Sequence, residues 1–294
     1  MKKTLAVFFA LTFVFTSFTW AQTIEDAMRL TSQERGVGSR ALGMGNAYIG
    51  VSDDFSATYW NPAGLAQMRR IEITGGLTHY SYSNSTAYLG QTTDDSKSAT
   101  KLDNIGFAFP FPTRQGSFVI AFGYNRVADY TTALSYNGYN PNSSIIPTLH
   151  DASDTYNIPF NTYLESESGY TALNGNVNQN GVVRESGGLG NWAFAAAIDV
   201  APDISFGLTF NVLNGSYKYE RTYIESDAHN VYNNMNPNLP VDSAYLRFNK
   251  FTLDNVIDDN ITGINAMFGM MYRSDRFRIG LTIKTPTTVK VTET

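Results

Sequence analysis

Large apolar and small residues alternate strictly over several short stretches of this chain. Between Ile105 and Phe111 every odd position is Ile or Phe, while the even positions between them are Gly, Ala and Pro. From Phe118 to Tyr124 the large residues stand at the even positions instead. Because successive side chains of a β-strand point to opposite faces, this period of two predicts strands with one aromatic face and one small-residue face.

The same alternation recurs further along the chain, and short polar turns join the segments in pairs. Val289 and Val291 keep the phase of the last segment beyond Pro286. In the first segment the apolar phase slips between Leu77 and Tyr80, as it would at a β-bulge. The predicted strands, seven in all, are residues 71–82, 104–111, 117–125, 192–200, 204–212, 264–272 and 277–283.

The face opposite the aromatic residues decides between a soluble and a membrane fold. In a soluble β-sandwich that face would be charged and solvated, but here it carries Gly, Ala, Ser, Thr and Asn with few charges. Large aromatic residues suit the lipid-facing band of a barrel, and each segment approaches the roughly 9–11 residues that a tilted spanning strand needs. We therefore predict an all-β fold, a transmembrane antiparallel β-barrel, and keep the soluble sandwich as the alternative.

Connections between the predicted strands alternate between short and long. Short turns close three hairpins, whereas the links near 127–190 and 214–261 are long and polar. Bacterial outer-membrane barrels have this asymmetry, with short periplasmic turns and long extracellular loops. We therefore expect these two links to be extracellular and the amino terminus to lie on the periplasmic side.

An odd number of strands does not close a barrel of the usual bacterial kind. It would leave unpaired strand edges, and hydrocarbon does not tolerate them. We therefore expect residues 69–294 to be a partial barrel, the N-terminal part of a longer one. The alternative is an unrecognised eighth strand within Ala244–Phe251.

The first residues predict export. Lys2 and Lys3 precede an apolar run from Leu5 to Phe18, and Thr19-Trp20-Ala21 offers a small-residue cleavage site. The run is shorter than the roughly 20 residues of a spanning helix. We therefore predict a cleaved signal peptide at 1–21 and a mature protein in the outer membrane.

Composition and spacing give little support to other classes of function. The formal net charge of −5 argues against a nucleic-acid partner, and the absence of cysteine removes disulfides, thiolate metal sites and a cysteine nucleophile. His79, His150 and His229 have no Asp, Glu or second His at the spacing of a metal site. We expect no enzymatic activity, no cofactor and no metal.

Residues 22–68 precede the first predicted strand and are rich in glycine. The run Arg35–Ala47 lacks both a preceding strand and the G-x-G-x-x-G order of a dinucleotide-binding loop. Glycine also permits tight turns and close backbone approach. We expect this segment to fold inside the barrel lumen.

Three stretches of the chain resemble one family. Asn61-Pro62-Ala63 stands just before the first predicted strand, Arg40–Gly45 is a glycine-containing segment before it, and Phe268–Thr287 covers the last hairpin. In these positions the chain resembles the FadL/TodX family of outer-membrane transporters for long-chain fatty acids and hydrocarbons. A purely local role, in which Asn61 and Pro62 only redirect the chain, is the alternative for the first motif.

The resemblance implies a 14-stranded barrel, most simply a monomer, surrounded by lipid and lipopolysaccharide and plugged by a hatch at 22–68. It also implies capture of a hydrophobic small molecule by Tyr136–Leu164, gating by the hatch from Gln22 to Gln67, and lateral release where the third strand bends. Our candidate kink is Gly123, Asn125 and Arg126, because polar residues interrupt the apolar face there. A strand that simply leaves the membrane is the alternative. Ligand-binding residues are not identified.

Two other functions remain open. The type IX secretion subunit PorV belongs to a related family that shares much of the hatch pattern, and it defines a secretion-associated barrel. A general porin is the third class. A porin needs charged residues on its lumen face for ion selectivity, and the small neutral faces here disfavour it.

Overall fold

The structure is a computed structural model, and it describes residues 36–151, 158–166, 169–232 and 248–293. The predicted signal peptide at 1–21 and the first part of the predicted hatch lie outside these residues. Among the described residues, no helix is long and apolar enough to cross a membrane.

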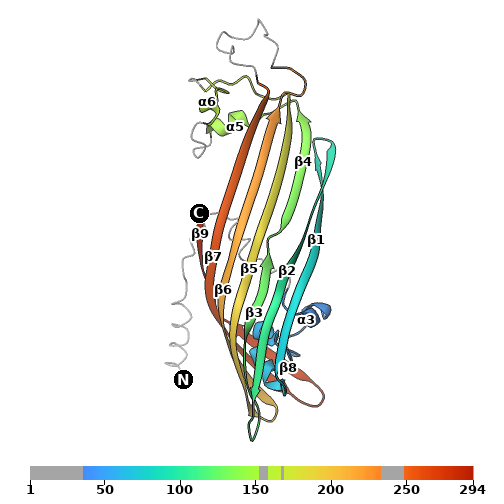
Figure 1. Ribbon diagram of the computed structural model, residues 1–294, viewed down its shortest axis with the longest axis vertical. Helices are drawn as coiled ribbons and strands as arrows, with labels where there is room; N and C mark the ends of the chain where they lie inside the picture. The colour runs from blue at the N-terminus through green and yellow to red at the C-terminus, as the bar shows by residue number, and fades with distance from the viewer. Residues whose placement is uncertain (1–35, 152–157, 167–168, 233–247, 294) are drawn as a thin grey trace, which may run out of the picture. The chain divides into compact units, whose positions relative to one another are not determined.

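One curled antiparallel sheet, half of a barrel, makes up most of the described chain (Figure 1). Its strands are β1 (Glu72–Tyr88), β2 (Gln91–Phe111), β3 (Phe118–Asp129), β4 (Thr132–Asn140), β5 (Val177–Ala201), β6 (Ile204–Ser226), β7 (Lys250–Arg273), β8 (Arg278–Lys284) and β9 (Thr288–Glu293). They lie in the order β1-β2-β3-β5-β6-β7-β8. The predicted all-β antiparallel fold is thus confirmed.

The sheet has seven positions, as many as the predicted strands. The other two strands share a neighbour with the strand before them, since β4 pairs with β5 as β3 does, and β9 pairs with β7 as β8 does. The bulge predicted in the first strand between Leu77 and Tyr80 is absent, since β1 pairs with β2 without interruption there. The β1–β2 register shifts between Gly76 and Leu77 instead, where Asp103 of β2 is the extra residue.

The two long loops were predicted too long. β5 begins at Val177, β6 continues to Ser226 and β7 begins at Lys250, so parts of 127–190 and 214–261 are strand. These strand ends carry polar residues on both faces, and their backbone ladders rather than apolar alternation define them. Residues 250–251 start β7 and form no separate strand, while 244–247 lie outside the described residues.

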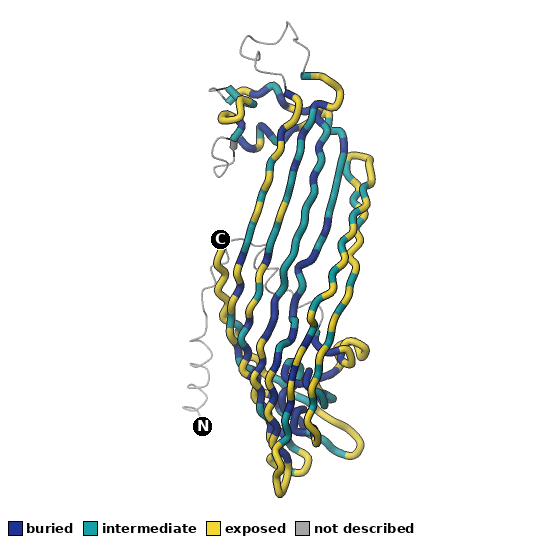
Figure 2. The backbone as a smooth tube through the Cα atoms, in the orientation of Figure 1, coloured by how far each residue is buried: buried dark blue, intermediate teal, exposed yellow. Residues whose placement is uncertain are grey.

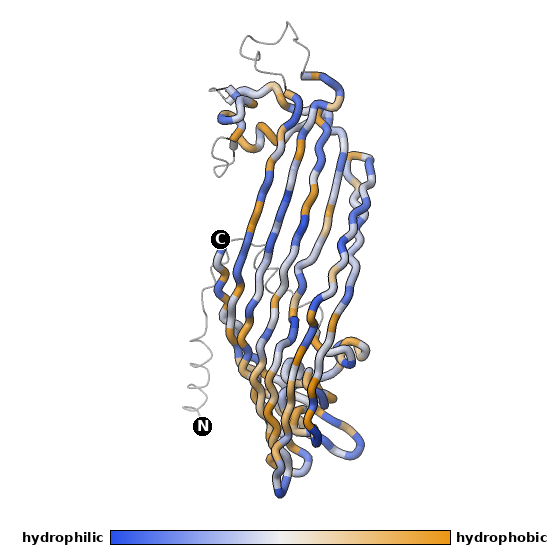
Figure 3. Tube along the Cα trace, viewed as in Figure 1, coloured by the Kyte–Doolittle hydropathy of each residue, from blue (hydrophilic) through white to orange (hydrophobic). Residues whose placement is uncertain are grey.

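Hydrophobic residues gather toward one end of the strands (Figure 3). We call the large exposed side chains of the outer face there the apolar band. It includes Ile105, Phe107, Phe118, Ile120, Phe122, Trp192, Phe194, Ile198, Leu208, Phe210, Ile264 and Phe268. The inner face at the same level is buried and small (Figure 2), with Ala108, Ala121, Ala193, Ala195 and Ala197.

The N-terminal segment, residues 36–68, covers this inner face. It contains α3 (Ser39–Gly43), α4 (Ala57–Trp60) and the 3₁₀ helix η1 (Pro62–Gln67), and η1 contacts β3, β5, β6 and β7. Phe55, Leu65 and Met68 form one buried core with the small residues of the sheet. Two short helices, α5 (Ile146–Asp151) and α6 (Ile158–Asn161), lie at the opposite end of the strands (Figure 1).

Candidate functional site

Asn61 ties the N-terminal segment to the sheet. Its side chain is fully buried, and Nδ2 donates to the carbonyl oxygens of Ile49, at 3.0 Å, and Met270, at 3.1 Å. Oδ1 accepts from the backbone N–H of Ala63 at 3.1 Å and so caps η1, where Pro62 occupies the first helical turn. One residue therefore makes the local turn and also docks the segment on β7.

Two glycines make room for this motif. Gly207 of β6 and Gly269 of β7 are paired in register, and both face the N-terminal segment. A Cβ atom at Gly207 would lie 2.3 Å from the carbonyl carbon of Pro62, and one at Gly269 would lie 2.2 Å from Oδ1 of Asn61. The motif Asn61-Pro62-Ala63 thus sits in a notch that no larger residue would leave open.

A second pair of glycines receives Phe55. Gly106 of β2 and Gly123 of β3 are paired in register, and Cβ atoms there would lie 2.3 and 2.5 Å from Cζ of Phe55. The Phe55 ring is buried, and its backbone N–H donates to Oε1 of Glu72 at 2.9 Å. The wall between β2 and β3 is therefore thin at this point and backed by one aromatic ring.

The sheet loses a backbone ladder just beyond this ring. Pairing between β2 and β3 ends at Asn104↔Asn125, although β3 stays paired with β5 as far as Asp129, with a register shift between Arg126 and Ala128. Of the candidate kink residues, Gly123 lies in both ladders, Asn125 is the last partner of β2, and Arg126 pairs with β5 alone. We call the unpaired boundary between 91–103 of β2 and β3–β4 the seam.

Side chains bridge the seam in place of the ladder. Lys101 Nζ forms an ion pair with Asp129 at 2.8 Å and donates to the carbonyl oxygen of Gly187 at 3.0 Å. Near the tip of the hairpin, Arg184 of β5 pairs with Asp95 at 2.5 Å. The Ser135 hydroxyl, and then Arg184, hold the pKa of Asp95 below its usual range. The two edges are thus joined by side chains, both charged pairs and tyrosine hydrogen bonds to Thr131 and Gln179, which can separate without breaking a strand.

The predicted capture segment Tyr136–Leu164 begins in β4 and then enters the helical end of the molecule. Its apolar residues help to form a cluster of Ile146, Leu149, Leu173, Val177, Phe248 and Phe251. We call this cluster with α5 and α6 the cap.

Glu225 of β6 anchors the cap. Its fully buried carboxylate accepts from Ser144 Oγ at 2.5 Å, the backbone N–H of Ile145 at 2.8 Å and Gln179 Nε2 at 2.9 Å. Tyr223 OH donates to it at 2.6 Å, and burial, reinforced by this bond, raises the pKa of the Tyr223 phenol well above its ordinary value. The cap is therefore a folded element and not a loose loop.

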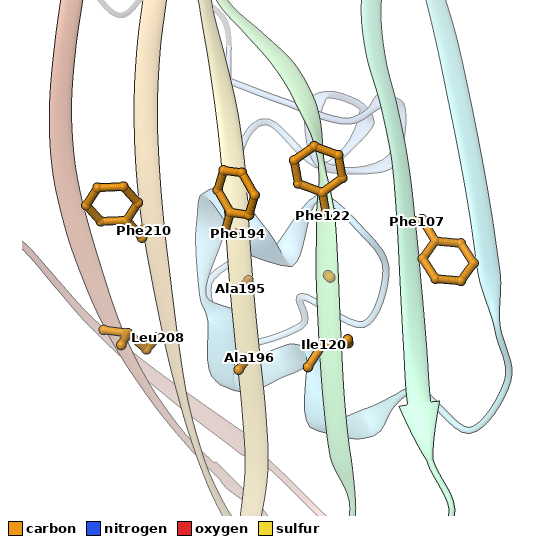
Figure 4. A pocket seen from close by; sticks show the side chains of 9 residues that line it. Phe107, Ile120, Phe122, Phe194, Ala195, Ala196, Leu208 and Phe210 are labelled. Carbon is orange, nitrogen blue, oxygen red and sulfur yellow. The ribbon is translucent and has the colours of Figure 1, made fainter.

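An apolar depression lies on the outer face of the sheet (Figure 4). It forms because Ala196 stands in register between Ile120 and Leu208, with Phe122, Phe194 and Phe210 around it. These side chains belong to the apolar band, so the depression faces away from the N-terminal segment.

Nothing in the described residues suggests a metal centre. No group of three His, Cys, Asp or Glu side chains there is close enough to hold an ion. His79 Nδ1 contacts Thr100 Oγ1 at 2.8 Å on an exposed strand surface.

Sequence reasoning singled out the Asn61 motif and, as a candidate kink, Gly123, Asn125 and Arg126, next to which the β2–β3 ladder ends. It missed the two glycine notches, the ion pairs of the seam and the Glu225 anchor. The fold and these contacts define a class, an all-β protein with one curled antiparallel sheet and an N-terminal segment docked on its inner face.

Comparison of the chain with known proteins gives no match. A scan against protein-family models gives no match, and searches of curated proteins and of solved structures also find no similar protein.

Proposed function

We propose that the protein is an outer-membrane β-barrel channel for the uptake of hydrophobic small molecules, such as long-chain fatty acids or aromatic hydrocarbons. The observation that carries the proposal is that one sheet has a broad apolar outer face and an inner face obstructed by its own N-terminal segment. A soluble protein rarely exposes so large an apolar surface, whereas a lipid-embedded wall requires one.

The height of the apolar band supports a membrane location. On β5 it runs over residues 192–200, and at about 3.3 Å per residue that length is roughly 30 Å along the strand. A strand tilted by about 40° would then rise roughly 23 Å, close to the apolar height of outer-membrane barrels.

The docked segment supports the choice of ligand. In our proposal the N-terminal segment, packed on the inner face at the level of the band, obstructs a water-filled pore there, and a porin is therefore the weaker candidate. Apolar molecules gain free energy by leaving water for such a wall. In our proposal the cap captures the ligand, the hatch at 22–68 moves, and the ligand leaves sideways at the base of the seam, where the β2–β3 ladder ends beside the apolar band.

Uptake of radiolabelled oleate tests the proposal. The full-length gene is expressed in a strain that lacks its own fatty-acid transporter, as wild type and as Asn61→Ala, and heat-modifiable gel mobility verifies barrel insertion. We expect uptake by the wild type and a loss of uptake of about tenfold or more in the inserted mutant. The reason is that Asn61 holds the hatch by two hydrogen bonds between uncharged groups, each worth about 1 kcal/mol. An inserted wild type without oleate uptake would contradict the proposal and favour a secretion-associated barrel.

A further inference from the structure

Five asparagines form a single row across the inner face of the sheet. The register pairs Asn104 with Asn125, Asn125 with Asn191, and Asn211 with Asn265. Asn191 itself pairs with Leu213 and reaches Asn211, two residues away on β6, diagonally. The row therefore crosses β2, β3, β5, β6 and β7, with a step of two residues between β5 and β6. All five side chains are buried, with at most 8 % of the residue exposed.

Part of the row is a chain of hydrogen bonds with one direction. Asn191 Nδ2 donates to Asn211 Oδ1 at 2.8 Å, and Asn211 Nδ2 donates to Asn265 Oδ1 at 2.8 Å. Asn265 Nδ2 then donates to Thr287 Oγ1 at 3.1 Å. Each of these amides thus donates to the next acceptor in the direction of the β8–β9 edge.

The chain is interrupted at Asn125. Its Nδ2 donates at 3.2 Å to Oγ1 of Thr58, which belongs to the N-terminal segment, and not to its strand neighbour Asn191. The side-chain oxygens of Asn104, Asn125 and Asn191 are buried and have no hydrogen-bond partner. Such acceptors are costly to leave unpaired, so the row lacks a bond that its register would allow.

We propose that Asn125 is a positioning residue with two alternative partners, Thr58 when the N-terminal segment is docked and Asn191 when it is not. Once Thr58 withdraws, Asn125 Nδ2 donates to Asn191 Oδ1, and Asn125 Oδ1 becomes the acceptor for the amide of Asn104. The row then runs unbroken from β2 to β7. The inference rests on the proposed function only in that the segment moves.

The change of partner at Asn125 affects the pairing of β2 with β3. Asn104↔Asn125 is the last pair of the β2–β3 ladder, at the base of the seam. While the segment is docked, this pair lacks its side-chain bond, and when the segment leaves, the pair gains one. Docking of the segment and tight pairing at the seam base therefore exclude each other.

Hydrogen exchange tests this coupling directly. We compare Thr58→Val, which keeps the shape but removes the acceptor, with Thr282→Val, which removes a similar bond from the Thr282 hydroxyl to the carbonyl oxygen of Trp60 outside the row. Mass spectrometry on the full chain in detergent follows the backbone amides of the β2–β3 ladder. We expect Thr58→Val to slow exchange next to Asn104 and Asn125 by about fivefold, the factor for one net hydrogen bond, and Thr282→Val not to slow it.

The same comparison in a variant that lacks the Asn191 side chain tests whether Asn191 is the new partner of Asn125. In Asn191→Ala, or in Asn191→Ser if the first variant fails to fold, Thr58→Val should no longer slow exchange. If Thr58→Val and Thr282→Val act alike, or if the slowing persists without Asn191, the proposal is wrong. Because no readout depends on uptake, the inference and the transport proposal can fail separately.

Discussion

Single residues fix how the N-terminal segment sits on the sheet. Asn61 supplies the hydrogen bonds, and Gly207 and Gly269 supply the space in which it fits. Asn61 was recognisable from the sequence because Asn-Pro is a turn signal at any position. The glycines were not, because only the β6–β7 register places them opposite each other and under Pro62.

Enlarging a notch residue should undock the segment. In Gly207→Ala the new Cβ would meet backbone atoms of Pro62 and Ala63, and such overpacking costs about 1–3 kcal/mol. We expect spin labels on Met44→Cys and Arg276→Cys to report a longer and broader distance distribution. The chain has no native cysteine, so the labels are specific.

Gly75→Ala is the matched control for the notch variant. Gly75 lies in strand β1, and a Cβ there would meet no atom within 4 Å. An unchanged label distance in Gly207→Ala, or an equal change in both variants, would show that the notch does not hold the segment.

At the scale of elements, the seam divides the sheet into two parts with different kinds of contact. Backbone ladders join β3 to β5, β5 to β6 and β6 to β7, whereas side chains alone join the upper β1–β2 hairpin to β4 and β5. Ladders resist changes of pH, and carboxylate contacts do not. The hairpin should therefore respond to acid before the rest of the sheet.

We expect the hairpin to separate from β4 as the pH falls below 3.8, the ordinary value for Asp95. The folded pKa of Asp95 is lowered, so its contacts with Ser135 and Arg184 are present above that pH and are lost as the pH falls through the folded value. Spin labels on Thr92→Cys and Asn142→Cys measure the separation. In Asp95→Asn the distance should be long already at pH 7, and a wild-type distance that ignores pH would contradict the expectation.

The sequence was most informative where strands cross the apolar band. Alternation of Phe and Ile with Gly and Ala located all seven positions of the sheet, because one face there is apolar and the other packs against the segment. It failed for Val177–Gly190 and Gly215–Ser226, where both faces are polar and only pairing with a neighbour defines the strand. It also could not show the cap, since the Glu225 anchor joins residues 80 positions apart.

At the scale of the whole molecule, hydrophobic residues gather toward one end of the sheet and hydrophilic residues toward the other (Figure 3), and the large hydrophobic side chains of the first end are exposed. If the band lies in lipid, a charge placed there should impair insertion, while the same charge placed beyond it should not. Leu208 and Val256 are a matched pair, since both are exposed aliphatic residues at 55 % and 62 % on the outer face, inside and outside the band.

We therefore expect Leu208→Arg to reduce the fraction of protein that inserts into lipid vesicles, at a cost of about 2–4 kcal/mol for a charge near mid-membrane. Val256→Arg should insert like the wild type. Heat-modifiable gel mobility measures the inserted fraction. Equal insertion of both variants would argue that the apolar face meets something other than lipid.

The length of β5 sets the distance between the cap and the band. Residues 177–191 precede the band, and at about 3.3 Å per residue they extend the wall by roughly 50 Å, further than the band itself. Under the proposed function, a molecule bound at the cap is still a long way from lipid. The protein would thus take its cargo from beyond the sugars of the lipopolysaccharide layer. The polar part of the sheet would shield the cargo from these sugars until it reaches the hydrocarbon at the band.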